Sequence, residues 1–179
     1  ASVVTQAATW PVAATPVITI SQSDISKTAP QAFTLSVAAV ISDAGSLSYK
    51  WFKGGTLLAG KTTDTLSIAS SSTSDGGVYT VEVTNTFHGN ITTATSASMT
   101  VVVSPQLSMS STTDQTISFG GAITSITLSP TGGKSGTVVL SLFGSLPSGL
   151  TLDTSTGSAV ISGTPLVVGK YTVSIVATD

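Results

Sequence analysis

The stretch LPSGLTLDTSTGSAVISGTPLVVGKYTVSIVATD, residues 146–179, decides the fold, because short apolar runs alternate in it with Pro- and Gly-containing turns. Leu150 and Leu152 lie two residues apart, so an extended chain points both to one face. Tyr171 and Ile175, with the valine between them, are expected to alternate inward on the last strand. Since Pro and Gly fix turn geometry, the pattern indicates β-strands joined by tight turns.

This stretch is similar to the bacterial "putative Ig", cadherin-like repeat, whose members read LPxGLxLDxxTGxIxGTPxxxGxYxVxVxATD. The resemblance implies a β-sandwich in which Tyr171 is a structural residue. Cadherin-like relatives bind calcium between modules through carboxylates, which makes Asp153 and Asp179 weak calcium candidates. Calcium takes 6–8 oxygen ligands, and no clustered acidic motif stands here. We therefore expect no metal and interpret Asp153 as a turn residue that accepts nearby backbone amides.

A second pattern lies within residues 16–104, where Trp51 is followed by the sequence DGGVY, which begins at Asp75 and ends at Tyr79. The order and spacing resemble an immunoglobulin-like domain of the I-set kind. The resemblance implies that Trp51 packs across the core and that Tyr79 forms the tyrosine corner. Asp75 and Gly77 then belong to the turn that enters the tyrosine strand, and all four residues are structural.

Valine occupies both positions that match the usual inter-sheet cysteines of that family, Val37 and Val81. Two buried valines contribute about 1.5–3 kcal/mol each by apolar transfer, whereas a disulfide typically contributes 2–4 kcal/mol. The stability of the module is expected to depend on its apolar core, without a disulfide. Disulfide-free domains with this sequence pattern resemble those of bacterial surface proteins and phage virions.

The whole chain is predicted to be all-β, with two tandem immunoglobulin-like β-sandwiches at residues 16–104 and 105–179. A proline follows Ser104 and favours an extended joint there. Residues 1–15 are either a linker or the last strand of a preceding module. Strands are expected at 17–20, 33–40, 48–52, 65–68, 78–83 and 98–103, and then at 106–109, 116–119, 123–128, 136–143, 159–162 and 170–177.

The composition argues against several classes of function. Only 8% of the residues are charged, with 6 Lys plus Arg against 8 Asp plus Glu, and the chain has no cysteine and one histidine. Nucleic acids and anionic membranes require clustered cations, so neither is an expected partner, and no apolar run is long enough to insert in a membrane. Thiolate metal sites are excluded, and few catalytic constellations can be assembled. We predict that the protein is not an enzyme and needs no cofactor.

The first candidate for binding is the predicted hairpin that carries Phe87, His88 and Asn90, at the end of the sandwich where antibody-like loops lie. His88 itself is expected to be a solvated loop residue. Exposed aromatic residues offer an alternative, since they can stack on sugar rings, although Phe143 is expected in the second core. The aromatic residues considered for sugar binding are Trp10, Phe52 and Phe143.

These observations predict structural or adhesive display modules of a longer protein on a cell surface or virion. The partner would be a protein or glycan on a host or cell surface, or neighbouring subunits and modules. Two alternatives remain open. The modules could be carbohydrate-binding accessories of a secreted glycan-active enzyme, or a self-assembling structural subunit.

Overall fold

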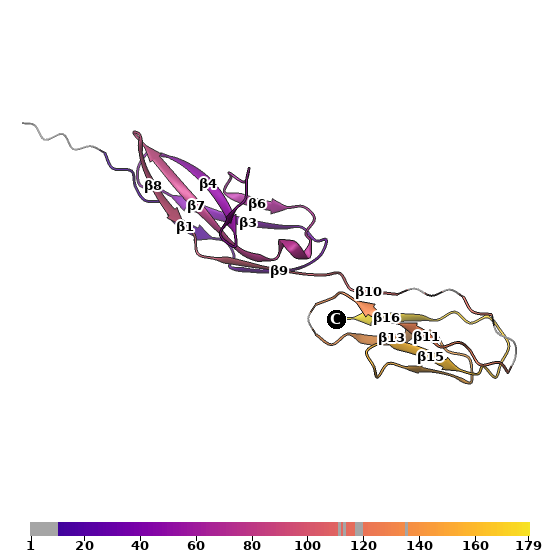
Figure 1. Cartoon of the computed structure of the whole chain (residues 1–179). Helices are drawn as coiled ribbons and strands as arrows, with labels where there is room; N and C mark the ends of the chain where they lie inside the picture. The colour runs from indigo at the N-terminus through magenta and orange to yellow at the C-terminus, as the bar shows by residue number, and fades with distance from the viewer. Residues whose placement is uncertain (1–10, 111, 113, 117–119, 135) are drawn as a thin grey trace, which may run out of the picture. The chain divides into compact units, whose positions relative to one another are not determined.

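The computed structural model describes residues 11–110, 112, 114–116, 120–134 and 136–179. Within these residues the regular elements are β-strands and one short 3₁₀ helix, so the prediction of an all-β protein is confirmed. The chain divides into two compact units, Ala1–Val103 and Ser104–Asp179 (Figure 1). No helix in the described part is long and apolar enough to cross a membrane.

Unit 1 contains two antiparallel sheets. One has the order β1-β3-β6, and the other has the order β2-β9-β7-β4-β5 with β8 paired to β7. The elements are β1 (Val17–Ile20), β2 (Asp24–Thr28), β3 (Phe33–Val40), β4 (Ser46–Lys53), β5 (Thr56–Leu57), β6 (Thr65–Ile68), η1 (Thr73–Asp75), β7 (Gly77–Phe87), β8 (Asn90–Thr95) and β9 (Met99–Ser104).

The core of unit 1 follows from the two-residue period of its strands. Alternate residues of β3 and β7 are buried, as a strand with one face toward a core requires. Strand β9 contributes on the same principle, with three buried residues in six positions. Val37 and Val81 are both buried members of this core, one from each sheet. The eleven core residues are Phe33, Leu35, Val37, Trp51, Leu66, Tyr79, Val81, Val83, Met99, Val101 and Val103.

Trp51 lies on β4 directly opposite Val81 of β7 and is fully buried. Its indole Nε1 donates a hydrogen bond of 2.8 Å to the carbonyl of Thr63. A buried indole N–H costs free energy unless it finds such a partner. Trp51 therefore joins the centre of the core to the loop that precedes β6.

Tyr79 fixes the turn at the start of β7. Its hydroxyl donates a 2.6 Å hydrogen bond to the carbonyl of Asp75, and its ring meets Phe33 edge-on at 6.3 Å between centroids. The Asp75 carboxylate accepts the backbone N–H of Ser72 at 2.7 Å, which closes the 3₁₀ turn. Gly77 has φ 152°, a backbone conformation that residues with a Cβ rarely adopt, so the turn favours glycine there.

The strand expected at 98–103 is β9, one of two strands that share the side of β7 opposite β4. Strand β8 pairs with residues 82–87 of β7, and β9 pairs with residues 77–79. Between them Ser96 donates its N–H to the Val81 carbonyl at 2.9 Å and accepts the Val81 N–H on Oγ at 3.1 Å. Ser96 thus makes hydrogen bonds with Val81 in the gap between β8 and β9, where neither strand pairs with β7.

Unit 2 has shorter strands, with the sheets β11-β15-β14, β13-β16 and β10-β12. Among its described residues the buried apolar side chains are those of Pro147, Ala159 and Ile161. The second unit is therefore far less closely packed than the first. Its strands are β10 (Ser108–Met109), β11 (Ile126–Leu128), β12 (Pro130–Thr131), β13 (Val139–Phe143), β14 (Leu150–Asp153), β15 (Ala159–Gly163) and β16 (Ser174–Thr178).

Two expectations for unit 2 are wrong. Tyr171 is 45% exposed, because β16 begins only at Ser174 and the tyrosine ring lies over the backbone of Gly169. Phe143 is 76% exposed, because Leu140 and Leu142 take the inward positions of β13. The strand predicted at 116–119 falls mostly on residues 117–119, which lie outside the described part.

Candidate functional site

The hairpin between β7 and β8 brings together the three residues predicted to bind. Phe87 and Asn90 are paired across the turn, and His88 and Gly89 form the two-residue connection with φ 47° and 80°. Positive φ at both positions is the geometry of a type I′ turn, which matches the twist of paired strands. The Phe87 ring stands edge-on against His88 with centroids 4.3 Å apart, and the side chain of His88 is exposed.

The side chain of Asn90 binds the entering segment, the residues that precede β1. Its Nδ2 donates a 2.8 Å hydrogen bond to the carbonyl of Pro11. Two positions further along β8, Thr92 donates its hydroxyl to the carbonyl of Ala14 at 2.7 Å. Between these two contacts Ala13 is buried, only 4% exposed. The hairpin thus packs against the entering segment.

Two further polar residues complete this contact, and the sequence analysis did not identify them. Asp43, in the turn between β3 and β4, accepts the N–H of Ala14 on Oδ2 at 2.6 Å. Asn85 of β7 donates Nδ2 to the Ala14 carbonyl at 2.8 Å and to the Asp43 carboxylate at 3.0 and 3.1 Å. We call the residues Asp43, Asn85, Asn90 and Thr92 the entry clamp.

The clamp is closely fitted around Asn85, which is fully buried. Gly45 lies so near that a Cβ there would be 2.0 Å from Oδ1 of Asn85. That oxygen has no hydrogen-bond partner among the described residues, while the amide nitrogen donates to two groups, the Ala14 carbonyl and the Asp43 carboxylate. One signal could have revealed Asn85 in the sequence: it takes the next inward position of β7 after three buried apolar residues, Tyr79, Val81 and Val83.

The electrostatics of the clamp favour an ionised Asp43. The hydrogen bond from the backbone N–H of Ala14 is the largest influence and lowers the pKa of Asp43, and bonds from Gly45 and Asn85 act in the same direction. Desolvation opposes them without reversing the shift. The carboxylate is therefore an acceptor that binds backbone, and it has no partner in the clamp that could relay a proton.

Acid is expected to release the entering segment. A carboxyl whose pKa is lowered by folding stabilises the folded state above its unfolded pKa, near 3.9, and loses that contribution as the pH falls through its folded pKa. We expect hydrogen exchange at the Ala14 amide, corrected for intrinsic rate, to accelerate below about pH 4. Asp43→Asn should give fast exchange already at neutral pH.

The matched control is Asp24→Asn, an exposed carboxylate on β2 whose side chain bonds, within the described part of the chain, only to Ser23 at 3.4 Å. That variant should leave exchange at Ala14 unchanged. Slow exchange at Ala14 in Asp43→Asn would contradict the assignment of Asp43 as the acceptor that holds the segment.

The structure does not bring the two weak calcium candidates into a cluster. Asp153 accepts the N–H of Ser155 on Oδ1 at 2.8 Å, and this hydrogen bond lowers the pKa of its carboxyl. Asp179 accepts the backbone N–H of Lys134. Across the described residues no group of three or more His, Cys, Asp or Glu side chains is placed to hold a metal ion.

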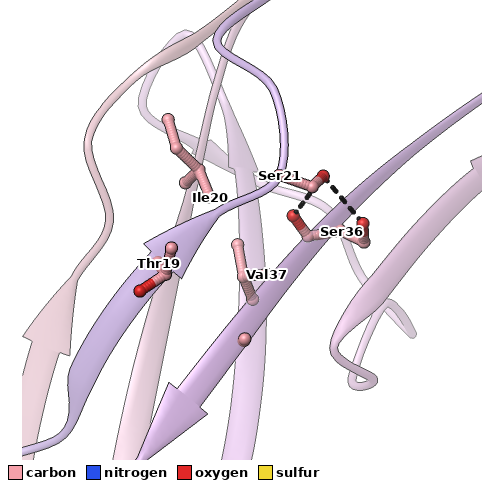
Figure 2. A pocket seen from close by; sticks show the side chains of 6 residues that line it. Thr19, Ile20, Ser21, Ser36 and Val37 are labelled. Atoms are coloured by element: carbon pink, nitrogen blue, oxygen red, sulfur yellow. Dashed lines mark hydrogen bonds between the residues drawn. The ribbon is translucent and has the colours of Figure 1, made fainter.

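A small depression lies on unit 1 where β1 pairs with β3 (Figure 2). Its volume is about 200 Å³, and its lining has no charged or titratable side chain. Ser21 and Ser36 are joined at its rim by a 2.9 Å contact between their hydroxyls, and the Ser21 hydroxyl also donates to the Ser36 carbonyl at 3.1 Å. The depression offers no chemistry for catalysis.

Comparison with known proteins agrees with the strand architecture. Residues 100–179 match the model of a family described as "Putative Ig domain". A three-domain structure of titin domains I67–I69 superposes with TM-score 0.53 at 11% identity, over 93% of this chain and 65% of that one. The insect immune protein hemolin superposes with TM-score 0.56 at 19% identity, over 84% of this chain and 40% of that one.

The chain therefore spans less than two thirds of the length of either structure. No curated protein matches its sequence. At these identities the structural likeness concerns the fold, and with the family match it shows that the chain consists of immunoglobulin-like β-sandwich domains.

Proposed function

We propose that the chain supplies non-catalytic structural and adhesive display modules of a longer bacterial or phage protein, exposed on a cell surface or virion. The two modules would be an I-set-like domain at residues 16–104 and a cadherin-like repeat at 105–179. The observation that carries the proposal is the entry clamp. It fixes the segment Pro11–Ala14 to unit 1 by hydrogen bonds from three separate parts of the fold.

A fixed entry is what a spacing module needs, because a flexible joint would not hold the direction of whatever precedes it. The clamp side chains bind the backbone N–H and carbonyl of Ala14, so they fix the path of the main chain there. The few carboxylates with lowered pKa, such as Asp43 and Asp75, accept backbone hydrogen bonds within turns and at the clamp. Such carboxylates serve the scaffold, which supports the non-catalytic part of the proposal.

The adhesive part of the proposal rests on the hairpin turn beside the clamp. Phe87 and His88 form an edge-on aromatic pair at the end of unit 1, and the strands beneath hold it rigidly. Binding loops on a rigid scaffold are a common arrangement, and weak contacts gain strength when many copies act together. A protein or glycan on a host or partner surface would be the ligand.

Single-molecule force extension tests the structural role. Two separate unfolding events are expected, with contour increments of about 3.3–3.6 Å per residue of each unit. Unit 1 should resist more strongly than unit 2, because its core is far better packed. Extension with no force peak would contradict a spacing role.

Beads coated densely with the chain test adhesion against panels of cell-surface glycans and proteins. We expect retention of the coated beads, and a loss of that retention in the double variant Phe87→Ala, His88→Ala. Leu57→Ala, a substitution of an exposed apolar residue on β5, is the control and should bind as the unmodified chain does. Equal retention of all three proteins would remove the hairpin from the adhesive surface.

Carbohydrate binding is the second candidate, and one observation favours it. Phe143 is 76% exposed on the outer face of β13, two positions from Ser141, so an aromatic ring and a hydroxyl share one face. Rings of this kind can stack on a sugar. A glycan array should then give hits that Phe143→Ala removes and that Val139→Ala, on the same face, retains.

A further inference from the structure

Strand β4 has an open edge along its first part. One side of the strand pairs with β7 over its whole length, Ser46–Lys53. The other side pairs with the short strand β5 at Phe52 and Lys53, and no other described strand pairs there. The chain that connects β5 to β6 lies entirely within the described residues. The free edge at residues 46–50 is therefore a feature internal to unit 1.

The ladder with β7 shows which backbone groups face this edge. Val81 lies opposite Trp51, and both its N–H and its carbonyl bind Ser96, on the side of β7 away from β4. Trp51 and Val81 therefore form a pair without ladder hydrogen bonds. Because such pairs alternate with hydrogen-bonded ones, the N–H and carbonyl groups of Tyr49 and Leu47 also point away from β7. They reach the open edge, where no described residue binds them.

The edge of β4 has little protection against another strand. Natural sheets protect exposed edges with proline, bulges or outward charges. Residues 46–53 pair with β7 without a break in register, and the strand contains no proline. The charged residue among residues 46–50 is Lys50, whose ammonium binds the Glu82 carboxylate of β7 at 3.2 Å. This ion pair draws the charge over the sheet and away from the open edge.

We propose that the open edge of β4 binds the same edge of a second copy of the chain, antiparallel and about a two-fold axis at Ser48. This register places Leu47 of each copy opposite Tyr49 of the other. The N–H and carbonyl groups that face the edge then bind one another, so each of them gains a partner. The two sheets become one continuous sheet across the pair of molecules.

The distribution of charge on β4 suits a second copy as the occupant. In this register Lys50 lies opposite Ser46 of the other copy, so the two lysines do not face each other. Like charges directly opposite would destabilise the pair, and each Lys50 keeps its own Glu82. A strand that pairs with its own copy about a two-fold axis closes after two molecules, so the product is a dimer.

Apolar packing and the extent of the contact are also consistent with this register. Leu47 and Tyr49 are half-buried and pack against the core, and in the dimer they become neighbours across the joint. Each side chain then loses further surface to solvent. The pairing ends at Lys50, because Leu58 already lies beside Trp51 and donates its N–H to the Trp51 carbonyl at 2.8 Å.

Sedimentation velocity over a wide range of protein concentration tests the proposal. The unmodified chain should form a dimer whose fraction rises with concentration. Ser48→Lys should be monomeric, because two ammonium groups would meet at the two-fold axis. Thr93→Lys is the matched control, since Thr93 is an exposed hydroxyl residue in the same cross-strand row, two strands away, and it should dimerise normally. A monomer at every concentration, or a dimer that persists in Ser48→Lys, would overturn the proposal.

Complementary charges test the position of the axis. Ser48→Glu should be monomeric alone, like Ser48→Lys. An equimolar mixture of the two variants should dimerise, because opposite charges then face each other at the axis. A mixture that stays monomeric would show that Ser48 does not face Ser48 of a second copy.

A single cysteine gives an independent readout, since the chain has none of its own. Opposite residues of a non-hydrogen-bonded pair have Cβ atoms about 4.5–5.5 Å apart, close to the separation in a disulfide. Under mild oxidation Ser48→Cys should form a linked dimer about tenfold or more faster than Thr93→Cys. Equal rates would contradict the pairing of the two β4 edges. Adhesion is measured separately through the hairpin, so each result leaves the proposed function to its own test.

Discussion

Trp51→Ala is expected to unfold unit 1 or leave it barely stable. Trp51 is fully buried at the centre of the core, and its removal also leaves the Thr63 carbonyl without its 2.8 Å partner. Replacing a buried tryptophan by alanine typically costs about 3–5 kcal/mol, a large part of the 5–15 kcal/mol that stabilises a domain. Urea unfolding followed by far-UV circular dichroism measures the loss.

Phe52→Ala provides the control from the same strand. Phe52 follows Trp51 directly, so it points to the opposite face of the sheet, and it is only half-buried. Its loss should cost about 1 kcal/mol or less. Equal effects of the two substitutions, or an unchanged urea midpoint in Trp51→Ala, would show that Trp51 does not organise the core.

Three strands of unit 1 could be predicted with their bounds because apolar residues recur in them at every second position. The expected ranges 17–20, 33–40 and 65–68 are those of β1, β3 and β6. Strand β8 was not predicted, since its sequence NITTAT carries one large apolar residue and nothing marks an inward face. Strand β2, with the sequence DISKT, was missed for the same reason.

The entry clamp could not be predicted from local sequence. Asn85 and Ala14 are separated by 71 positions, and Asp43 and Asn85 by 42. The period of β7 indicates that Asn85 faces inward, but only the folded chain shows which backbone group it meets. The hairpin residues Phe87, His88 and Asn90 were easier to find, because a two-residue His-Gly turn is a local feature.

Unit 2 shows where a pattern of alternation misleads. Residues 170–177 alternate as a strand should, yet the ladder with β13 covers only Ser174–Thr178. A strand needs a neighbour along its whole length to hold an extended chain in place, and the residues before Ser174 have none among the described residues. Tyr171 consequently remains on the surface instead of entering a core.

The double variant Val37→Cys, Val81→Cys is expected to form a disulfide and to stabilise unit 1 by roughly 2–4 kcal/mol in the oxidised state. Val37 of β3 and Val81 of β7 are buried in one core and belong to different sheets. A bridge between them would join the two sheets and restrict the unfolded chain. Titration of free thiols and thermal unfolding, with and without reductant, measure both parts of the expectation.

The sign of the change in stability distinguishes the effect of the disulfide from the effect of lost packing. With reductant present the double variant should be less stable than the unmodified chain, because each valine has lost apolar volume. Val37→Cys, Val83→Cys is the matched control: Val83 is equally buried but lies two residues further along β7, about 6.6 Å away from the position of Val81. Disulfide geometry tolerates little displacement, so this pair should keep free thiols. Free thiols in the Val81 variant, or a bridge in the Val83 variant, would show that Val37 and Val81 are not the facing pair of the two sheets.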